Sequence, residues 1–331
     1  MIISRTPFRV SFFGGGTDYP AWYRQHSGAV IGTAIDKYCY ITARNLPPLF
    51  EHKHRIVYSQ IENVKNIEDI QHPAVRAILQ EFRIDEGLEI HHDGDLPARS
   101  GLGSSSSFTV GLVNVLYALR GQMITKKELG QEAIRIEQEV IKESVGSQDQ
   151  IWAAHGGLSR INFSSDGDIE VCPLIVSADR RIELENSLTL FFSGISRTAD
   201  AIAKKQIANM EAKAANLHRI YEMVDEATNI LHDKRADISE FGKLMTESWR
   251  LKRDISVEVS NDRIDEIFDA AMDAGAIGGK LLGAGGGGFF LFMSAPNRRD
   301  ALRERLRGLV DVTFKLAAEG SKIVVYEPQG F

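Results

Sequence analysis

The spacing of hydrophobic and polar positions changes along the chain, from strand-like runs to helical stripes. In the first third, β-branched and aromatic runs between turn residues predict strands at residues 9–13, 29–34, 38–43, 55–58 and 88–92. After residue 103, apolar positions with a helical period predict helices at residues 104–119, 126–143, 200–232, 238–250, 263–274 and 298–309. Further strands are predicted at residues 157–163, 188–192, 289–293, 312–316 and 323–326. Strand-rich and helix-rich blocks alternate only loosely, which indicates an α+β fold and disfavours a doubly wound parallel sheet.

The length of the chain and one polar segment predict two domains. The chain has 331 residues, a length typical of about two domains. Ser164, Ser165, Asp166 and Gly167 begin a mostly polar stretch between two predicted strands. We therefore predict an N-terminal domain at residues 1–175 and a C-terminal domain at residues 176–331.

Composition and charge restrict the class of partner. Hydrophobic residues make up 43% and charged residues 25%, with a formal net charge of −6, which suits a soluble globular protein and argues against a broad nucleic-acid surface. The two cysteines, Cys39 and Cys172, exclude a disulfide framework and a four-cysteine zinc site. No apolar run approaches the roughly 20 residues that span a bilayer. We expect a cytoplasmic protein that binds a small anionic molecule, and neither nucleic acid nor a membrane; whether it forms a homodimer stays open.

A glycine- and serine-rich segment between a predicted strand and a predicted helix is the strongest chemical feature. Its glycines let the backbone turn tightly, and the following helix presents free N–H groups and the positive end of its dipole. This arrangement predicts a cradle for an anion, usually phosphate. A serine-rich helix cap is the alternative, although four serines exceed what one cap requires. The residues of this predicted cradle are Pro97, Ser100, Gly101, Leu102, Gly103, Ser104, Ser105 and Ser106.

Two further glycine clusters lie near the ends of the chain. Gly283, Gly285 and Gly288 form a literal G-x-G-x-x-G, but a predicted strand follows them where a dinucleotide-binding fold has a helix. We therefore predict a loop between two strands, which argues against a nicotinamide oxidoreductase. The other cluster, residues 14–16, follows a strand and precedes Asp18. Asp18 can accept hydrogen bonds from sugar hydroxyls or form an Asx-type turn.

These three motifs, in this order, resemble those of the GHMP kinases, whose middle motif P-x-x-x-G-L-G-S-S covers the nucleotide phosphates. Here that motif occupies residues 97–105. The resemblance implies a ribosomal-protein-S5-like N-terminal domain and a ferredoxin-like C-terminal domain with the active site between them. Within the family, residues 14–18, 147–150 and 193–197 are most similar to the kinases of D-glycero-D-manno-heptose 7-phosphate. Galactokinase-like members carry an acidic-His pair at the positions of Gly15 and Gly16, which disfavours galactose.

The resemblance implies an ATP- and Mg²⁺-dependent kinase that phosphorylates the C1 hydroxyl of the heptose 7-phosphate. Asp149 would be the catalytic carboxylate, in the first turn of a helix that Ser147 could cap, and Arg9 would pair with it. Glu137 matches the family spacing for a metal ligand, together with Ser105, and a slip of one residue would substitute Ser104 or Ser106. The helical pattern alone does not separate Glu137 from Glu139.

The substrate site implied by the resemblance combines the first and third motifs. Arg197 is the predicted partner of the substrate's own phosphate, with Lys37, Arg99 and Lys204 as rivals. An anomeric kinase for a fucose- or galactose-like sugar is the nearest alternative, and a non-catalytic sensor of ATP or sugar is another. The joint presence of the catalytic and metal-binding candidates disfavours the sensor. The predicted substrate-binding residues are Gly15, Gly16, Thr17, Asp18, Gln148, Arg197, Gly285 and Gly286.

Overall fold

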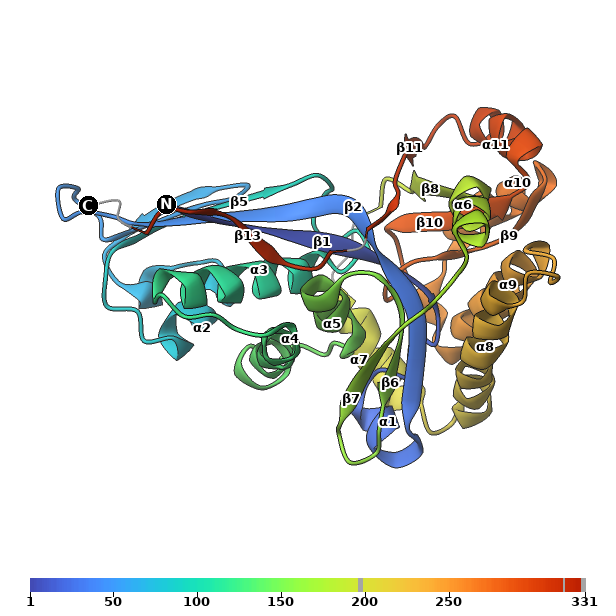
Figure 1. Cartoon of the computed structure of the whole chain (residues 1–331), viewed down its shortest axis with the longest axis horizontal. Coiled ribbons are helices and arrows are strands. Elements are labelled where there is room, and N and C mark those ends of the chain that lie inside the picture. The colour runs from blue at the N-terminus through green and yellow to red at the C-terminus, as the bar shows by residue number, and fades with distance from the viewer. Residues whose placement is uncertain (196–198, 318, 329–331) are drawn as a thin grey trace.

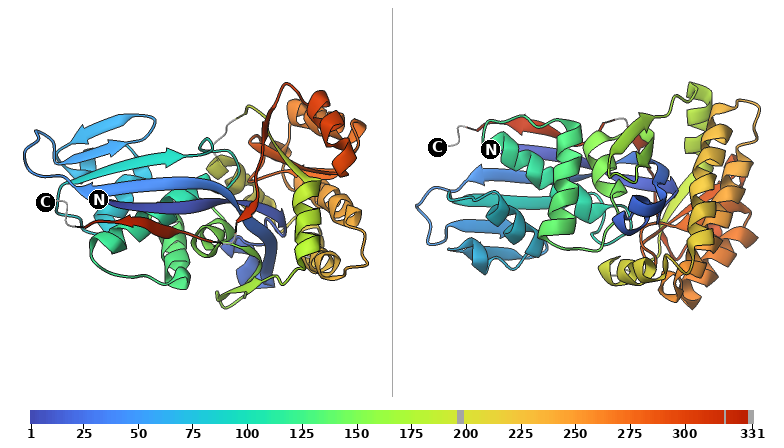
Figure 2. Two further views of the ribbon diagram at one scale, coloured as in Figure 1. Left: turned by 45° about the horizontal axis from the view of Figure 1, so that its top comes forward. Right: turned by 90° about the horizontal axis from the view of Figure 1, so that it is seen from below.

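Two β-sheets, each with its own helices, form two neighbouring lobes (Figure 1). The computed structural model describes residues 1–195, 199–317 and 319–328. The long sheet and the helices beneath it make the first lobe, while the shorter sheet and the last helices make the second (Figure 2). None of the helices in the described part combines the length and apolar character that a membrane crossing requires.

The first sheet is built around the long strand β2, Gly28–Asn45. Its path runs β13-β1-β2-β5-β3-β4, with β6, β7 and β12 joined beside it. The first half of β2 pairs with β6 and its second half pairs with β5, so that one strand serves two arms of the sheet. The other strands are β1 (Ile2–Phe13), β3 (His54–Val57), β4 (Ile61–Val64), β5 (Leu88–Gly94), β6 (Leu158–Phe163), β7 (Ile169–Pro173), β12 (Leu316–Ala317) and β13 (Lys322–Tyr326).

Helices cover one face of the first sheet, and the most buried of them is α3, Ser104–Leu119 (Figure 1). Its side chains are apolar on most sides, as expected of a helix between a sheet and an outer helical layer. A π-helical turn, Ile136–Val140, continues directly from α4. The other helices here are α1 (Pro20–His26), α2 (Pro73–Glu81), α4 (Lys126–Arg135) and α5 (Gln148–His155), with a 3-10 turn at Ile67–Asp69.

The second lobe holds an antiparallel sheet in the order β11-β8-β10-β9. Its strands are β8 (Leu188–Phe192), β9 (Ala276–Leu281), β10 (Phe289–Ser294) and β11 (Val310–Val312). Its helices are α6 (Ala178–Ser187), α7 (Ala199–Asn209), α8 (Ala214–His232), α9 (Ser239–Ile255), α10 (Asp262–Asp273) and α11 (Arg299–Arg305), with 3-10 turns at Val257–Val259 and Pro296–Arg298.

The two lobes share one hydrophobic core at the end of β1. Phe12 and Phe13 contact Phe241 of α9 edge to face, with ring centroids 5.3 and 5.0 Å apart. All three rings are fully buried. Such pairs contribute about 0.5–1.5 kcal/mol each beyond the burial of their area. The end of β1, which leads into the first glycine cluster, is therefore fixed against the second lobe.

The predicted α+β class is confirmed, and several predicted boundaries shift. The helix predicted at residues 200–232 is two helices, because the chain leaves the helix between Asn209 and Ala214. The polar stretch taken as a boundary contains β7 and α6. The division at residue 175 stays a prediction; β12 and β13, which it assigns to the second domain, pair with the first sheet.

Candidate active site

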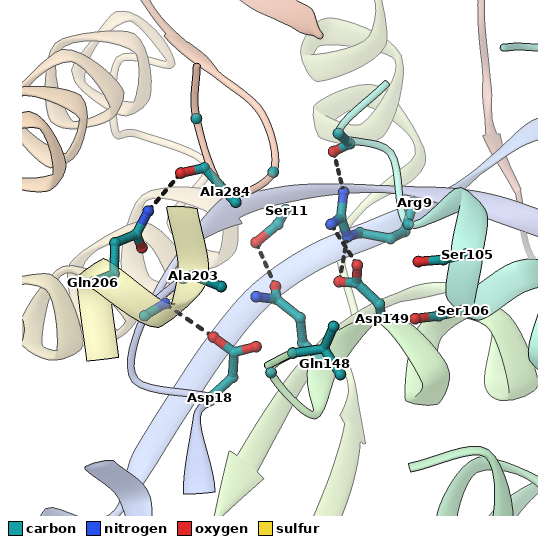
Figure 3. A pocket seen from close by; sticks show the side chains of 18 of the residues that line it. Arg9, Ser11, Asp18, Ser105, Ser106, Gln148, Asp149, Ala203, Gln206 and Ala284 are labelled. Atoms are coloured by element: carbon teal, nitrogen blue, oxygen red, sulfur yellow. Dashed lines mark hydrogen bonds and ion pairs between the residues drawn. The ribbon is translucent and has the colours of Figure 1, made fainter. Parts of the chain in front are cut away.

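A cleft lies between the lobes where the three glycine clusters meet (Figure 3). The first lobe contributes the end of β1, the loop before α3 and the start of α5. The second lobe contributes α7, α9 and the loop between β9 and β10. The residues that line the cleft include Arg9, Ser11, Gly15, Gly16, Asp18, Arg99, Gly101, Gly103, Ser104, Ser105, Ser106, Gln148, Asp149, Gln206, Lys252, Lys280, Gly283, Ala284 and Gly285.

Arg9 and Asp149 form a two-point ion pair at the centre of this cleft (Figure 3). Arg9 Nε donates to Asp149 Oδ1 and Arg9 Nη2 donates to Asp149 Oδ2, each over 2.7 Å. A bidentate pair of this kind fixes the plane of the carboxylate. Asp149 lies in the first turn of α5, as predicted, but the side chain of Ser147 does not cap that helix in the described structure. The Ser147 hydroxyl instead accepts a hydrogen bond from Gln138 Nε2 at 3.1 Å.

The glycine- and serine-rich loop leads into the N-terminus of α3, which faces the cleft. Gly101 and Gly103 have φ of +83° and +75°, a region that glycine adopts without strain. No described side chain caps α3, whose N-cap residue is Gly103. The first N–H groups of this 16-residue helix are therefore available to an anion.

The middle and third glycine clusters pack backbone against backbone. A Cβ atom on Gly101 would lie 2.6 Å from Leu282 O, and one on Gly283 would lie 2.5 Å from Gly101 Cα. Phe289 N also donates to Ser100 O at 3.0 Å. The glycines are needed here because no side chain fits between the loops. The predicted loop between two strands at residues 283–288 is confirmed, since β9 precedes it and β10 follows it.

Glu137 lies behind the loop, and only one of its two carboxylate oxygens has hydrogen-bond partners in the described structure. Its Oε2 accepts hydrogen bonds from Ser106 Oγ, at 2.9 Å, and from Gln150 Nε2, while Oε1 has no partner among the described atoms. Burial raises the pKa of Glu137 to about 7. The hydroxyl that contacts Glu137 is that of Ser106, whereas the predicted partner Ser105 is exposed. One residue along a helix rotates a side chain by about 100°, so only one of the two can face Glu137.

An unpartnered buried carboxylate oxygen beside a hydroxyl suits a hard cation. Mg²⁺ is held by oxygen ligands and usually takes one or two from the protein, with phosphates and water completing its shell. Glu137 and Ser106 supply such a pair, and Glu137 Oε1 is the atom left free for it among those described. The donor set therefore fits the predicted metal, with Ser106 in place of Ser105.

Asp18 and Gln148 line the opposite side of the cleft (Figure 3). Asp18 Oδ1 accepts a hydrogen bond from Gly16 N at 2.9 Å, and burial raises the pKa of Asp18. Gln148 Oε1 accepts from Ser11 Oγ at 2.7 Å. A Cβ on Gly146 would lie 1.9 Å from Asp18 Oδ2, so a side chain at that position would displace the Asp18 carboxylate. Carboxylate and amide groups fixed in this way can bind sugar hydroxyls.

Several predicted site residues lie outside the cleft lining. Leu102 belongs to the hydrophobic core, Pro97 is exposed, and Ser100 is buried beneath the loop. Thr17 is bound to backbone groups of its own turn, since its hydroxyl donates to Gly14 O at 2.8 Å. Gly286 N donates to Val259 O at 2.9 Å. These residues shape the loops rather than face the cavity. Arg197 lies outside the described residues.

The sequence analysis missed several lining residues, among them four whose side chains form hydrogen bonds in the cleft. Gln206 of α7 donates from Nε2 to Ala284 O, Lys252 of α9 donates to Gly283 O, and Lys280 of β9 donates to Phe12 O. Ser11 holds Gln148 as described above. Ser11 and Lys280 each lie three residues before a glycine cluster, whereas Gln206 and Lys252 lie on helices that reach the cleft only after distant segments have packed together. The hydrophobic alternation that marks β1 is the one signal that could have indicated Ser11.

The family models of the GHMP kinases match both lobes. The N-terminal domain model covers residues 69–157 and the C-terminal model covers residues 223–310. The chain therefore belongs to the GHMP kinases and is a phosphotransferase, with the two-domain fold of that family.

Among curated relatives, the chain is similar to the D-glycero-alpha-D-manno-heptose 7-phosphate kinase of Campylobacter jejuni, at 30% identity over 97% of this chain and 98% of the relative. It is also 27% identical to the bifunctional fucokinase/GDP-fucose pyrophosphorylase of Arabidopsis thaliana, over 91% of this chain and 30% of that protein.

Solved structures share the fold. A D-glycero-D-manno-heptose 1-phosphate kinase from Bacteroides thetaiotaomicron superposes with a TM-score of 0.79 at 22% identity, over 99% of this chain and 100% of the other. The Lactococcus lactis galactokinase crystallised with galactose gives a TM-score of 0.74 at 19% identity, over 97% and 94% of the two chains.

Proposed function

We propose that this protein transfers the γ-phosphoryl group of ATP to the C1 hydroxyl of D-glycero-D-manno-heptose 7-phosphate, forming the 1,7-bisphosphate. The observation that supports the proposal is the Arg9–Asp149 pair, because this fixed carboxylate lines the same cleft as the serines at the start of α3 and the side chains of Asp18 and Gln148. The choice of sugar rests on the similarity to the Campylobacter jejuni enzyme along nearly the whole chain.

The phosphates of ATP would bind along the loop from Gly101 to Ser106. The free N–H groups of α3 and the serine hydroxyls at its start supply donors for phosphate oxygens. Glu137 and Ser106 would hold Mg²⁺, which when bound supplies positive charge to the phosphate oxygens. Kinases of this family use ATP as donor, and that part of the proposal follows from family membership.

Asp149 would orient the C1 hydroxyl and receive its proton. The hydroxyl oxygen forms a bond to the γ-phosphorus, the bond from that phosphorus to the β–γ bridging oxygen breaks, and ADP leaves. Arg9 holds both oxygens of Asp149 and would also reduce the negative charge that faces the phosphoryl group. Asp18 and Gln148 would bind the sugar hydroxyls, and Arg197 remains a proposed partner of the substrate's phosphate.

The test is ADP release with Mg²⁺ and ATP across a panel of sugars. The panel pairs D-glycero-D-manno-heptose 7-phosphate with the unphosphorylated heptose, mannose, fucose and galactose. We expect release with heptose 7-phosphate alone, and phosphorus NMR of the product then identifies the carbon that is phosphorylated. Release with fucose or galactose instead would replace the substrate, in line with the fucokinase and galactokinase relatives. Bound ATP with no release across the panel would contradict the proposed substrate and mechanism.

A further inference from the structure

Two lysines of the second lobe reach into the cleft without a carboxylate partner. Lys280, on β9, is 4% exposed, and its Nζ donates to Phe12 O at 2.7 Å. Lys252, on α9, is half-buried and donates to Gly283 O. An ammonium group has three N–H donors. Each of these groups has one backbone carbonyl as its partner among the described atoms, so each has donors left over.

The charges around the two lysines do not balance. Of the described residues that line the cleft, Arg9, Arg99, Lys252 and Lys280 can carry positive charge, and Asp18 and Asp149 can carry negative charge. Asp149 is already engaged by Arg9 at both oxygens. Within the described residues neither lysine forms an ion pair, and residues 196–198, 318 and 329–331 contain no Asp or Glu.

Burial makes this excess charge costly. Burial lowers the pKa of Lys252 to about 8, and the nearby Asp18 carboxylate offsets that effect only in part. The pKa of Lys280 is also lowered by burial, with the charge of Lys252 adding to the effect. Buried charges are ordinarily paired. A cationic pocket that opens to solvent therefore suits an anionic group of the ligand.

Each lysine is bonded to a segment that borders the proposed sugar site. Lys280 is bonded to Phe12, the neighbour of Ser11, which holds Gln148. Lys252 donates to the carbonyl of Gly283 in the third glycine cluster. The neighbouring carbonyl, that of Ala284, accepts a hydrogen bond from Gln206 (Figure 3). The phosphates of ATP would have the free N–H groups at the start of α3 as their donors.

We infer that Lys252, supported by Lys280, binds the phosphate group of the sugar substrate and selects a phosphorylated sugar over a free one. The inference rests on the proposed function for the identity of the sugar. The inference assigns the substrate's phosphate to residues that the structure describes, whereas the sequence analysis predicted Arg197 for this role.

The test compares binding of the two sugars in the absence of nucleotide. Isothermal titration would measure D-glycero-D-manno-heptose 7-phosphate and the unphosphorylated heptose with the wild type, Lys252→Met, Lys252→Arg and Lys280→Met. We expect Lys252→Met to weaken binding of the phosphorylated sugar by roughly 10- to 100-fold, as loss of a charged hydrogen bond does. Binding of the free heptose and of ATP should not change, and Lys252→Arg should restore part of the preference. Lys243→Met, on an exposed part of the same helix, is the matched control.

Three results would overturn the inference. The first is a wild type that prefers the phosphorylated sugar while Lys252→Met and Lys280→Met, both folded by thermal denaturation, keep that preference. In that case ADP release by the wild type still supports the proposed function. The second is an equal loss for both sugars, which would assign the lysines to another part of the reaction. The third is a wild type that binds both sugars equally, which would remove the proposed substrate as well.

Discussion

Arg9 and Asp149 engage each other through both oxygens of the carboxylate, and the third guanidinium nitrogen, Arg9 Nη1, donates to Gly101 O at 2.6 Å. One side chain therefore links the strand β1, the start of α5 and the glycine- and serine-rich loop before α3. Arg9 is 6% exposed and Asp149 is 24% exposed at the side chain, so the carboxylate is the partner that a substrate can reach.

Asp149→Asn should keep the shape of the site and remove the carboxylate that we propose as the proton acceptor. We expect kcat to fall by about 10²- to 10⁴-fold, the usual contribution of a general base, with the Kd for ATP unchanged. Steady-state kinetics and a nucleotide-binding titration would measure both quantities. Asp179→Asn is the matched control, because Asp179 also lies in the first turn of a helix but is exposed. Wild-type turnover in Asp149→Asn would remove this residue from the chemistry.

Arg9→Lys should preserve the charge and lose the two-point geometry. A single ammonium cannot bind both oxygens of Asp149 and Gly101 O in the same plane. We expect kcat to fall roughly 10- to 100-fold, in keeping with the loss of charged hydrogen bonds. Arg5→Lys on the same strand, where Arg5 pairs with Glu319 at 3.2 Å, should leave kcat at the wild-type value. Equal kinetics for the two variants would show that the planar fork is not needed.

Gly101→Ala should separate the two glycine clusters. Its Cβ would lie 2.6 Å from Leu282 O, and φ at this position is +83°. We expect a loss of about 1–3 kcal/mol in the free energy of unfolding, the range for a strained backbone, and a higher KM for ATP. Urea denaturation would measure the first quantity. Gly121→Ala is the control, since φ there is +66° but no atom lies within 4 Å of the added Cβ; a larger loss in the control would contradict the argument.

Glu137→Gln should change how stability depends on pH in metal-free protein. Burial raises the pKa of Glu137 from 4.5 to about 7, so between these values the folded state binds more protons than the unfolded state. The free energy of unfolding that this group contributes therefore falls as pH rises through that window. The side chain of Glu137→Gln does not titrate, so this loss is absent from the variant. Its free energy of unfolding, relative to that of the wild type, should therefore rise by up to about 3 kcal/mol between pH 4.5 and 7. Denaturation in the presence of a chelator would measure the difference, and a pH-independent difference would refute the cause.

The same substitution should also raise the Mg²⁺ concentration needed for half-maximal activity. A neutral amide is a weaker ligand for a hard cation than a carboxylate. Titration of activity with Mg²⁺ would compare Glu137→Gln with Glu139→Gln, whose side chain is exposed. A shift in the second variant and none in the first would assign the metal to Glu139.

Local signals in the sequence predicted the parts of the fold that are bounded by glycine or by a sharp change in composition. Residues 104–119 and 188–192 were predicted with the bounds that the structure has. The break between α7 and α8 was not, because residues 210–213 contain no glycine or proline to mark it. The π-helical turn that carries Glu137 also left no sign in the apolar pattern.

For the site, the sequence indicated which loops meet but not which atoms face inward. Ser105 and Ser106 cannot be separated by motif alone, and their exposure depends on how α3 packs against Glu137. Lys252 and Lys280 come from a helix and a strand that reach the cleft only through contacts with the other lobe. Positions set by such long-range packing have no local pattern to reveal them.

The pairing of β13 with β1 has a consequence for the order of synthesis. β1 carries Arg9 and is synthesised long before β13, yet Ile2 to Arg5 gain their neighbours in β13 only when residues 322–326 have emerged. Until then this stretch of β1 is an edge strand with unpaired backbone groups, open to pairing with another nascent chain. A translation product that stops before residue 316 also lacks β12, and should therefore aggregate although it contains every described residue of the cleft.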